Sequence, residues 1–263
     1  MIRLQVMICT YGADGIKRVA LSQHPSVPEV EYLVGWQIDD TECPIPEELN
    51  RHDFKIFRHA TKGLSRNRNY LLSKATAPIL LISDDDVDYT PLQLKSVINA
   101  FDSNPEYDII TFRYDSTKSK KRYPNHSFYL WNAPKGYYTT SFEIGIRNKY
   151  YLSTLKFNES FGIGSGIFIA GEEDIFLHDC KKKKLKGIFI PITICTHTGD
   201  TTSERNLYNP LYIQTKGAVF IHIHPFTWPL RMVAHALREK NFIPLHKYIS
   251  NWIKGALISF VKN

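Results

Sequence analysis

The sequence predicts an α/β fold, in which helices cover a central β-sheet, followed by a helical C-terminal extension. Short β-branched and aliphatic runs alternate with helical stretches over the first half of the chain, the pattern expected of such a sheet. The composition agrees, since 43% of the 263 residues are hydrophobic and 22% are charged. These values exclude collagen-like, coiled-coil and wholly disordered chains.

Apolar runs are predicted to be strands where they are short and rich in β-branched residues. In chain order they cover residues 4–10, 32–38, 55–57, 79–82, 108–112, 143–146, 167–170 and 188–194. Helices are predicted at residues 14–23, 65–75, 91–101 and 172–182. Ser65 is the expected N-cap of the second helix, and Thr90, followed by Pro91, that of the third. The order of elements in the first half is that of a nucleotide-binding α/β half-domain.

The remaining segments are predicted to be a loop region and a helical tail. Residues 117–138 are polar, aromatic and basic without clean periodicity, so we expect loops over the carboxyl ends of the strands, where open α/β sheets bind ligands. After Arg205 the sequence is helical and amphipathic. We therefore predict a domain at residues 1–204 and a helical extension at 205–263.

Charge and cysteine content bear on partners and location. The formal net charge of +7 favours partners that carry phosphate or anionic lipid headgroups. The basic residues are dispersed and form no recognised nucleic-acid motif, so we expect no nucleic-acid partner. The four cysteines form no CxxC pair, residues 1–12 are too short and polar for a secretory signal, and no stretch approaches 18 apolar residues. These observations favour a cytoplasmic protein.

The strongest local signal is a run of three aspartates directly after an apolar strand, Ser83-Asp84-Asp85-Asp86. In an extended chain Asp84 and Asp86 project to one side, and Asp85 projects to the other. Two convergent carboxylates suit Mg²⁺ or Mn²⁺, whose shells are completed by substrate phosphates and water. An Asp-rich turn that caps the next helix is the structural alternative.

Two arginines open the helix that precedes these aspartates. The segment Lys-Gly-Leu-Ser-Arg-Asn-Arg-Asn at 62–69 places Arg66 and Arg68 in its first turn. Basic residues there oppose the helix dipole, so we expect a compensating anion, and phosphate is the candidate because free backbone N–H groups add to the same site. Pairing of the arginines with carboxylates is the alternative.

Two later segments carry candidate chemistry. Glu172, Glu173 and Asp174 open a helix after a glycine-rich stretch, where acidic residues either favour the helix dipole or present a general base to an acceptor hydroxyl. His197 follows the last predicted strand. A neutral imidazole there could complete a metal site, although a lone histidine is more often structural.

Taken in order, these segments resemble family 2 glycosyltransferases, which transfer a sugar from a nucleotide-diphosphate donor with inversion. The resemblance runs from Val6 to about Thr202. It includes the strand ending Cys-Thr-Tyr-Gly at 9–12, the strand ending Ile-Asp-Asp at 38–40, and the later motifs described above. The resemblance implies a GT-A fold, which is a Rossmann-like nucleotide-binding domain with a mixed sheet, and a hexosyltransferase-like reaction. It further implies a UDP-sugar donor, Mn²⁺ or Mg²⁺, and a glycan or lipid-linked glycan acceptor, as in bacterial surface polysaccharide synthesis.

The resemblance also implies roles for individual residues. Those assigned to nucleotide binding are Thr10, Tyr11, Asp39, Asp40, Arg66, Asp84 and Asp85. Thr10 and Tyr11 would line the pocket. Asp39 or Asp40 would accept from the base ring. Arg66 would face phosphate or base, and Asp84 would reach the ribose.

The metal and the chemistry are assigned to four further residues. Asp86 would hold the divalent ion, and His197 would approach the ion or the pyrophosphate. Asp174 would be the catalytic base, with Glu173 as the alternative. Two departures from the family pattern are Val87 in place of a further aspartate and the lack of a serine-rich continuation after the second strand. A metal-dependent nucleotidyltransferase and a non-catalytic sugar-nucleotide-binding module are the alternative functions.

The helical tail has two interpretations. Between Leu230 and Val261, residues such as Tyr248, Trp252 and Phe260 recur at helical spacing, with lysines elsewhere on the helix. Such a helix could lie on an anionic membrane surface, which would make the protein peripheral on the inner face of the cell membrane. It could equally pack its apolar face on the core.

Overall fold

The computed structural model describes residues 1–39, 43–116, 118, 121–148, 155–197 and 209–262. The chain divides into two compact units. The sheet unit contains Met1–Lys62, Arg66–Lys156 and Asp179–Gly199, and the helical unit contains Gly63–Ser65, Phe157–His178 and Asp200–Asn263. The predicted domain boundary at residues 204 and 205 lies outside the described residues and stays a prediction.

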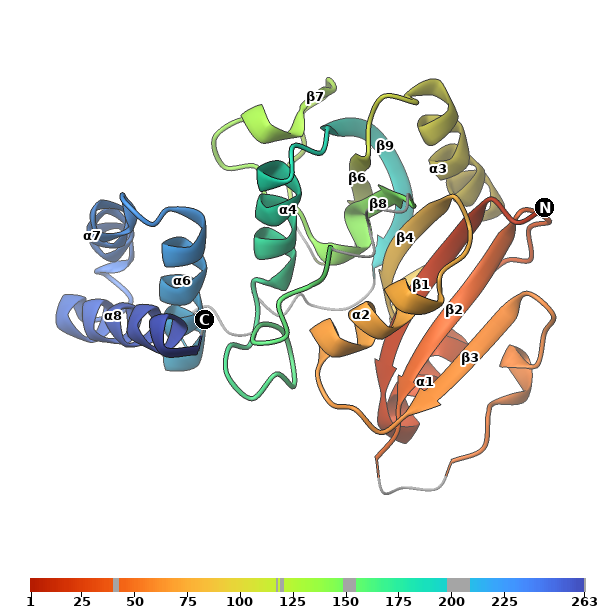
Figure 1. Ribbon diagram of the computed structural model, residues 1–263, viewed down its shortest axis with the longest axis horizontal. Helices are drawn as coiled ribbons and strands as arrows, with labels where there is room; N and C mark the ends of the chain where they lie inside the picture. The colour runs from red at the N-terminus through yellow and green to blue at the C-terminus, as the bar shows by residue number, and fades with distance from the viewer. Residues whose placement is uncertain (40–42, 117, 119–120, 149–154, 198–208, 263) are drawn as a thin grey trace. The chain divides into compact units, whose positions relative to one another are not determined.

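The described strands of the sheet unit form one mixed sheet of nine strands, in the order β3-β2-β1-β4-β8-β6-β9-β5, with β7 also paired to β9 (Figure 1). The bounds are β1 Leu4–Tyr11, β2 Val30–Gln37, β3 Phe54–His59, β4 Ile79–Asp84, β5 Val87–Asp88, β6 Ile109–Asp115, β7 Phe128–Tyr129, β8 Ile144–Arg147 and β9 Gly187–His197. Strands β1 to β4 pair in parallel, whereas β8 is antiparallel to both β4 and β6. The predicted α/β class and mixed sheet are confirmed.

The central strands are apolar on both faces because both faces are covered. All eight residues of β2 are buried, as are the first seven of β1. Helices α1 (Gly12–Leu21) and α3 (Pro91–Ser103) contribute Ile16, Val19, Leu94 and Phe101 to the same core. The predicted cap of α3 is confirmed, since Thr90 and Gln93 form a reciprocal capping box beside Pro91.

Two local predictions were wrong, and both concern residues near glycines. Ser65 is not an N-cap: it is the second residue of α2 (Leu64–Lys74), and its hydroxyl donates to the Phe161 carbonyl at 2.7 Å. Residues 167–170 are not a strand and show only an isolated bridge between Phe161 and Phe168. The glycines at 162, 164 and 166 have φ values of 100°, 76° and 79°, which interrupt extended backbone in this segment.

The loop prediction for residues 117–138 holds for most of its described residues. The exceptions are β7 and a short 3₁₀ turn at Leu130–Asn132, both of which lie against β9. Another 3₁₀ turn, Ser141–Glu143, precedes β8.

The helical unit contains the start of α4 (Glu172–Lys182) and the helices α6 (Pro210–Ile223), α7 (Trp228–Glu239) and α8 (Leu245–Lys262). Helices α6 and α8 cross in close contact, because a Cβ built at Gly255 would lie 1.8 Å from the Gln214 carbonyl oxygen. Tyr248 and Trp252 pack with Met232 in one apolar cluster. Among the described residues, no helix combines the length and apolar character needed to cross a bilayer.

Candidate active site

The parallel register brings several predicted nucleotide-binding residues to one edge of the sheet unit. Thr10 of β1 pairs with Trp36 of β2, and Cys9 pairs with Asp84 of β4, so Thr10, Tyr11 and Asp84 all lie at carboxyl ends of neighbouring strands. Asp39 follows β2, and its Oδ2 would lie 2.6 Å from a Cβ built at Gly12. Gly12 has a φ of 68°, so both its backbone and this close approach favour glycine. Asp40 lies outside the described residues.

Asp84, the last residue of β4, is held by two side chains. Arg68 Nη2 donates to its Oδ1 at 3.0 Å, and the Ser141 hydroxyl donates to its Oδ2 at 3.1 Å. Burial raises the pKa of Asp84, and the Arg68 guanidinium opposes that rise. Arg68 is only 1% exposed and is paired with Asp84. For this arginine the structure therefore shows the alternative to phosphate binding, which is pairing with a carboxylate.

Asp85 turns toward α1. Its Oδ2 accepts from the Thr10 hydroxyl at 2.6 Å, and Arg18 donates to its two oxygens at 3.0 and 2.9 Å. A Cβ at Gly15 would lie 2.2 Å from Thr10 Oγ1, so α1 passes close to this cluster. The structure therefore places Asp85 in a cross-link between β1, α1 and the turn, and its part in nucleotide binding stays a prediction.

Asp86 faces the last residue of β9. Its Oδ1 lies 3.3 Å from His197 Nε2, and Phe142 stacks on the imidazole with ring centroids 4.8 Å apart. Burial alone would raise the pKa of Asp86, but the hydrogen bond and charge of His197 lower it below its usual value. The antiparallel pairing of Val87 with His197 explains why residues so far apart in the sequence meet.

Asp86 and His197 fit a divalent ion as two of its ligands. Two ligands about 2.1 Å from one octahedral ion lie about 3 Å apart, close to the separation found here. Carboxylate oxygen and imidazole nitrogen are both donors that Mn²⁺ accepts. The described part of the chain has no group of three His, Cys, Asp or Glu side chains suited to a metal.

Arg66 is exposed in the first turn of α2. The neighbouring Asn67 ties this turn to the strand ends, because its amide donates to the Gly35 carbonyl at 2.7 Å and the Thr10 carbonyl at 3.3 Å. His59 Nε2 lies 3.1 Å from the Asn67 side-chain oxygen. Sequence reasoning missed Ser141 and Phe142, since only their contacts give them a role. It also missed Asn67, although the position of Asn67 between Arg66 and Arg68 was an available signal.

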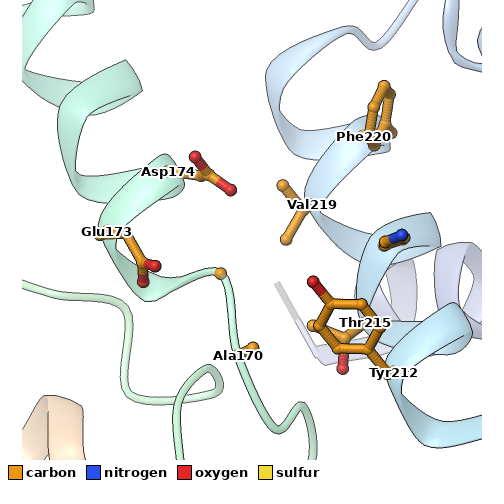
Figure 2. Close-up of a pocket in the computed structure, with 9 residues that line it drawn as sticks. Ala170, Glu173, Asp174, Tyr212, Thr215, Val219 and Phe220 are labelled. Atoms are coloured by element: carbon orange, nitrogen blue, oxygen red, sulfur yellow. The ribbon is translucent and has the colours of Figure 1, made fainter. Parts of the chain in front are cut away.

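A pocket of about 120 Å³ lies in the helical unit, between the start of α4 and α6. It is lined by Ala170, Gly171, Glu173, Asp174, Tyr212, Thr215, Lys216, Val219 and Phe220. Figure 2 shows the Asp174 carboxylate directed toward α6, and the Tyr212 ring on the opposite wall. Both the predicted catalytic base and its alternative therefore line the same pocket.

Gly171, which lines this pocket, lies too close to α6 to carry a side chain. Gly171 has a φ of 85°, and a Cβ there would lie 2.5 Å from Val219 Cγ2. Glu172 is 6% exposed, whereas Glu173 and Asp174 reach the pocket. Burial lowers the pKa of Lys216, whose ammonium lies 4.9 Å from the centre of the Tyr212 ring.

Solved structures similar to this chain share its fold. S. aureus TarS 1–349 is 15% identical, with a TM-score of 0.59, over all of this chain and 92% of that one. The same protein in complex with UDP-GlcNAc is 14% identical, with a TM-score of 0.59, over 95% and 90%. Mannosyltransferase PcManGT from Pyrobaculum calidifontis, in complex with GDP-Man and Mn²⁺, is 12% identical, with a TM-score of 0.56, over 99% and 88%. The fold is therefore GT-A, as the resemblance implied.

The model of the glycosyl transferase family 2 matches residues 38–169, half of the chain. The protein belongs to this family, so the resemblance found in the sequence is confirmed. None of the curated proteins matches the chain significantly in sequence. The matched region contains Arg66 and the three aspartates at 84–86, whereas Thr10, Asp174 and His197 lie outside it.

Proposed function

We propose that this family 2 glycosyltransferase transfers a hexose from a UDP-sugar to a glycan or lipid-linked glycan, with inversion at the anomeric carbon. The observation that carries the proposal is the division of acidic side chains between two sites. Asp84 and Asp86 lie at the sheet edge where open α/β folds bind nucleotides, and Asp174 lines a pocket. The UDP-GlcNAc complex of the TarS structure supports the choice of donor class.

In the proposed donor site, Thr10, Tyr11 and Asp39 contact the nucleoside, together with Asp40 and Asp85. Asp84 accepts from the ribose, and Arg66 donates to phosphate. Rigid placement of these groups is supported by the contacts of Asp84 with Arg68 and Ser141. A carboxylate held in place loses little freedom when the donor binds, which favours affinity.

Asp86 and His197 would hold Mn²⁺ or Mg²⁺, whose charge stabilises the diphosphate leaving group. The Mn²⁺ in the PcManGT complex supports this expectation for the fold. The geometry supports the role, because Asp86 Oδ1 and His197 Nε2 lie 3.3 Å apart and a neutral imidazole offers Nε2 to the ion. Phe142 fixes the plane of the imidazole by stacking on it.

Asp174 is the proposed general base. A sugar hydroxyl is not ionised at neutral pH, so its attack requires a positioned group that takes the proton. As the oxygen bonds to the anomeric carbon, the bond from that carbon to the diphosphate oxygen breaks with both electrons, and Asp174 receives the proton. One displacement of this kind inverts the configuration. Glu173, which lines the same pocket, is the alternative base.

We extend the proposal to the protein's setting: bacterial surface polysaccharide synthesis, in the cytoplasm and at the inner face of the cell membrane. The basic C-terminal helices support this setting, because anionic lipid attracts them.

The test is thermal unfolding of the full chain with Mn²⁺ and one nucleotide sugar at a time, such as UDP-GlcNAc, UDP-glucose or GDP-mannose. A donor at 100 times its Kd stabilises the folded protein by about 2.7 kcal/mol, so the true donor should raise the Tm clearly. Release of the donor's nucleoside diphosphate in the presence of an acceptor then distinguishes an enzyme from a non-catalytic binding module. Protection by no nucleotide sugar would contradict the proposal.

A further inference from the structure

Helix α7 has two apolar faces, of which only one is covered. Met232 and Ala236 are buried in a cluster with Tyr248 and Trp252 of α8. Leu230, Val233 and Leu237 are 75%, 45% and 52% exposed. Their spacing of three and four residues places them on one side of the helix, where they form an exposed apolar stripe.

Helix α8 repeats this arrangement. Tyr248, Trp252 and Ala256 are buried, whereas Ile253, Leu257 and Phe260 are exposed at the same spacing of four and three residues. Isolated exposed leucines are ordinary in proteins, but an exposed apolar stripe on each of two helices that pack together indicates a surface used for binding. We call Leu230, Val233, Leu237, Ile253, Leu257 and Phe260 the apolar stripes.

Basic residues border the stripes. Arg231 and Arg238 each follow a stripe leucine by one residue, about 100° further round the helix, and Lys254 follows Ile253 in the same way. Lys247 is exposed and lies seven residues before Lys254, on the same side of α8. Residues 210–263 contain seven lysines or arginines and one acidic residue, Glu239, so they carry six of the seven net positive charges. Long basic side chains beside an apolar surface can reach phosphate while their stems stay on the apolar side.

The charge and the stripes together select one kind of partner. A nucleic acid would match the charge but not the leucines and the phenylalanine. A second copy of the chain would match the stripes but would bring two basic surfaces together. An anionic bilayer surface matches both, since apolar side chains enter the boundary of the acyl chains while basic ones remain among the headgroups. Helix α7 has 12 residues, about 18 Å, which suits lying in the interface rather than crossing it.

We propose that the apolar stripes of α7 and α8, with Arg231, Arg238, Lys247 and Lys254, form a docking surface for an anionic lipid bilayer. The purpose of this docking rests on the proposed function, because the bilayer would hold the enzyme at the surface that carries a lipid-linked acceptor. Binding itself requires neither donor nor metal.

The experiment is co-sedimentation of the full chain with phosphatidylcholine vesicles that contain or lack phosphatidylglycerol. We expect binding only with phosphatidylglycerol, and weaker binding as salt is raised. Lys247→Gln with Lys254→Gln should weaken binding roughly tenfold or more. The matched control, Lys17→Gln with Lys95→Gln, changes two exposed lysines of the sheet unit and should leave binding unchanged.

The stripe is tested by Leu230→Gln with Leu237→Gln, against Leu21→Gln with Leu92→Gln, which are exposed leucines of the sheet unit. All four changes are at exposed sites, so each variant should keep its fold, and its Tm reports this. Equal loss in both pairs would overturn the proposal. The proposal would also be overturned if the α7 variant bound vesicles as before but had a lower molecular mass by light scattering. The stripe would then join two copies of the chain.

The proposal and the proposed function can fail separately. Asp86→Ala should bind vesicles like the unaltered protein, because it changes only the sheet unit. Vesicle binding by a protein that releases no nucleoside diphosphate from any donor would support the docking surface and contradict the proposed transferase activity. Sugar transfer by a protein that binds no vesicles would support the transferase activity and contradict the docking surface.

Discussion

Two acid-rich segments of this protein have similar composition and opposite surroundings. In the β4–β5 turn, each of Asp84, Asp85 and Asp86 has its own partner from another element: Arg68, Arg18 and His197, respectively. In the first turn of α4, Glu172 is buried, while Glu173 and Asp174 line a pocket. The number of carboxylates in a segment therefore says little about its use.

These opposite surroundings predict different effects of substitution in the two segments. The turn is a set of cross-links, so a change there should alter the stability of the sheet unit as well as the proposed ligand binding. The start of α4 presents side chains to a cavity, so a change there should alter turnover with little effect on folding.

The largest effect is expected from Asp174→Asn. General-base catalysis contributes roughly 10²- to 10⁴-fold, so kcat should fall by about that factor, while donor affinity and Tm stay nearly unchanged. The measurement is a transfer assay with donor binding determined separately. Glu173→Gln is the matched control, and a loss of turnover in that variant alone would transfer the role to Glu173.

Arg68→Met should produce the next largest effect, on stability. The Arg68 side chain is 1% exposed and that of Asp84 is 30% exposed, so removal of the guanidinium leaves a partly buried carboxylate without its cation, which costs roughly 2 kcal/mol of unfolding free energy. Arg18→Met is the control within the same turn, because the Arg18 side chain is 51% exposed and an exposed pair contributes about 1 kcal/mol or less. Urea unfolding measures both. Equal losses would show that burial does not distinguish the two pairs.

Asp86→Ala should remove the coupling between metal and nucleotide. Two protein ligands leave most of the coordination shell to phosphate and water, so Mn²⁺ should bind weakly alone and about tenfold more tightly with UDP. Calorimetry of Mn²⁺ with and without UDP measures this coupling. In Asp85→Asn, which changes a proposed nucleoside contact and the cross-link with α1 but no proposed metal ligand, the coupling should persist. Persistence in Asp86→Ala as well would remove Asp86 from the metal site.

The smallest effect concerns acid stability, which compares one histidine from each unit. Burial, assisted by the charge of Arg51, lowers the pKa of His24 from 6.5 to about 4. Burial, assisted by Arg238, lowers that of His235 to about 4. A lowered pKa means that the unfolded chain binds the proton more tightly, so stability is lost as pH falls from 6.5 toward 4.

For His24, this loss amounts to about 1 kcal/mol between pH 7 and 5.5. His24→Phe removes this titrating group, so the dependence of unfolding free energy on pH should become flatter over this range. Phenylalanine suits the site because His24 packs against the rings of Tyr32 and Phe54. His235→Phe should flatten the pH dependence less, since His235 is only half-buried. Denaturant unfolding at several pH values is the measurement, and an unchanged slope in His24→Phe would contradict the assignment.

Much of the fold could be predicted because parallel central strands are continuous apolar runs. Strands β1 and β4 and helix α4 lie where periodicity and composition placed them. The strand predicted at 167–170 failed because the positive φ values of nearby glycines outweigh the β-propensity of two isoleucines and a phenylalanine. Ser65 failed because its hydroxyl serves a distant carbonyl rather than its own helix.

The candidate site could be predicted in residue type but not in partners. Residues at the ends of parallel strands share an edge, so Thr10 and Asp84 could be grouped from the sequence. The pairing of Arg68 with Asp84, and of His197 with Asp86, depends on how α2 and β9 pack in the folded unit. No local pattern encodes those contacts.

The measurement that tests the account most directly is the anomeric configuration of the product. A single displacement, with Asp174 as the base, inverts that carbon. NMR of the product's anomeric proton, recorded early in a reaction with the donor that protects the protein, should therefore show the opposite configuration to the donor's. Retention of the donor's configuration would contradict a single displacement and the role of Asp174 within it.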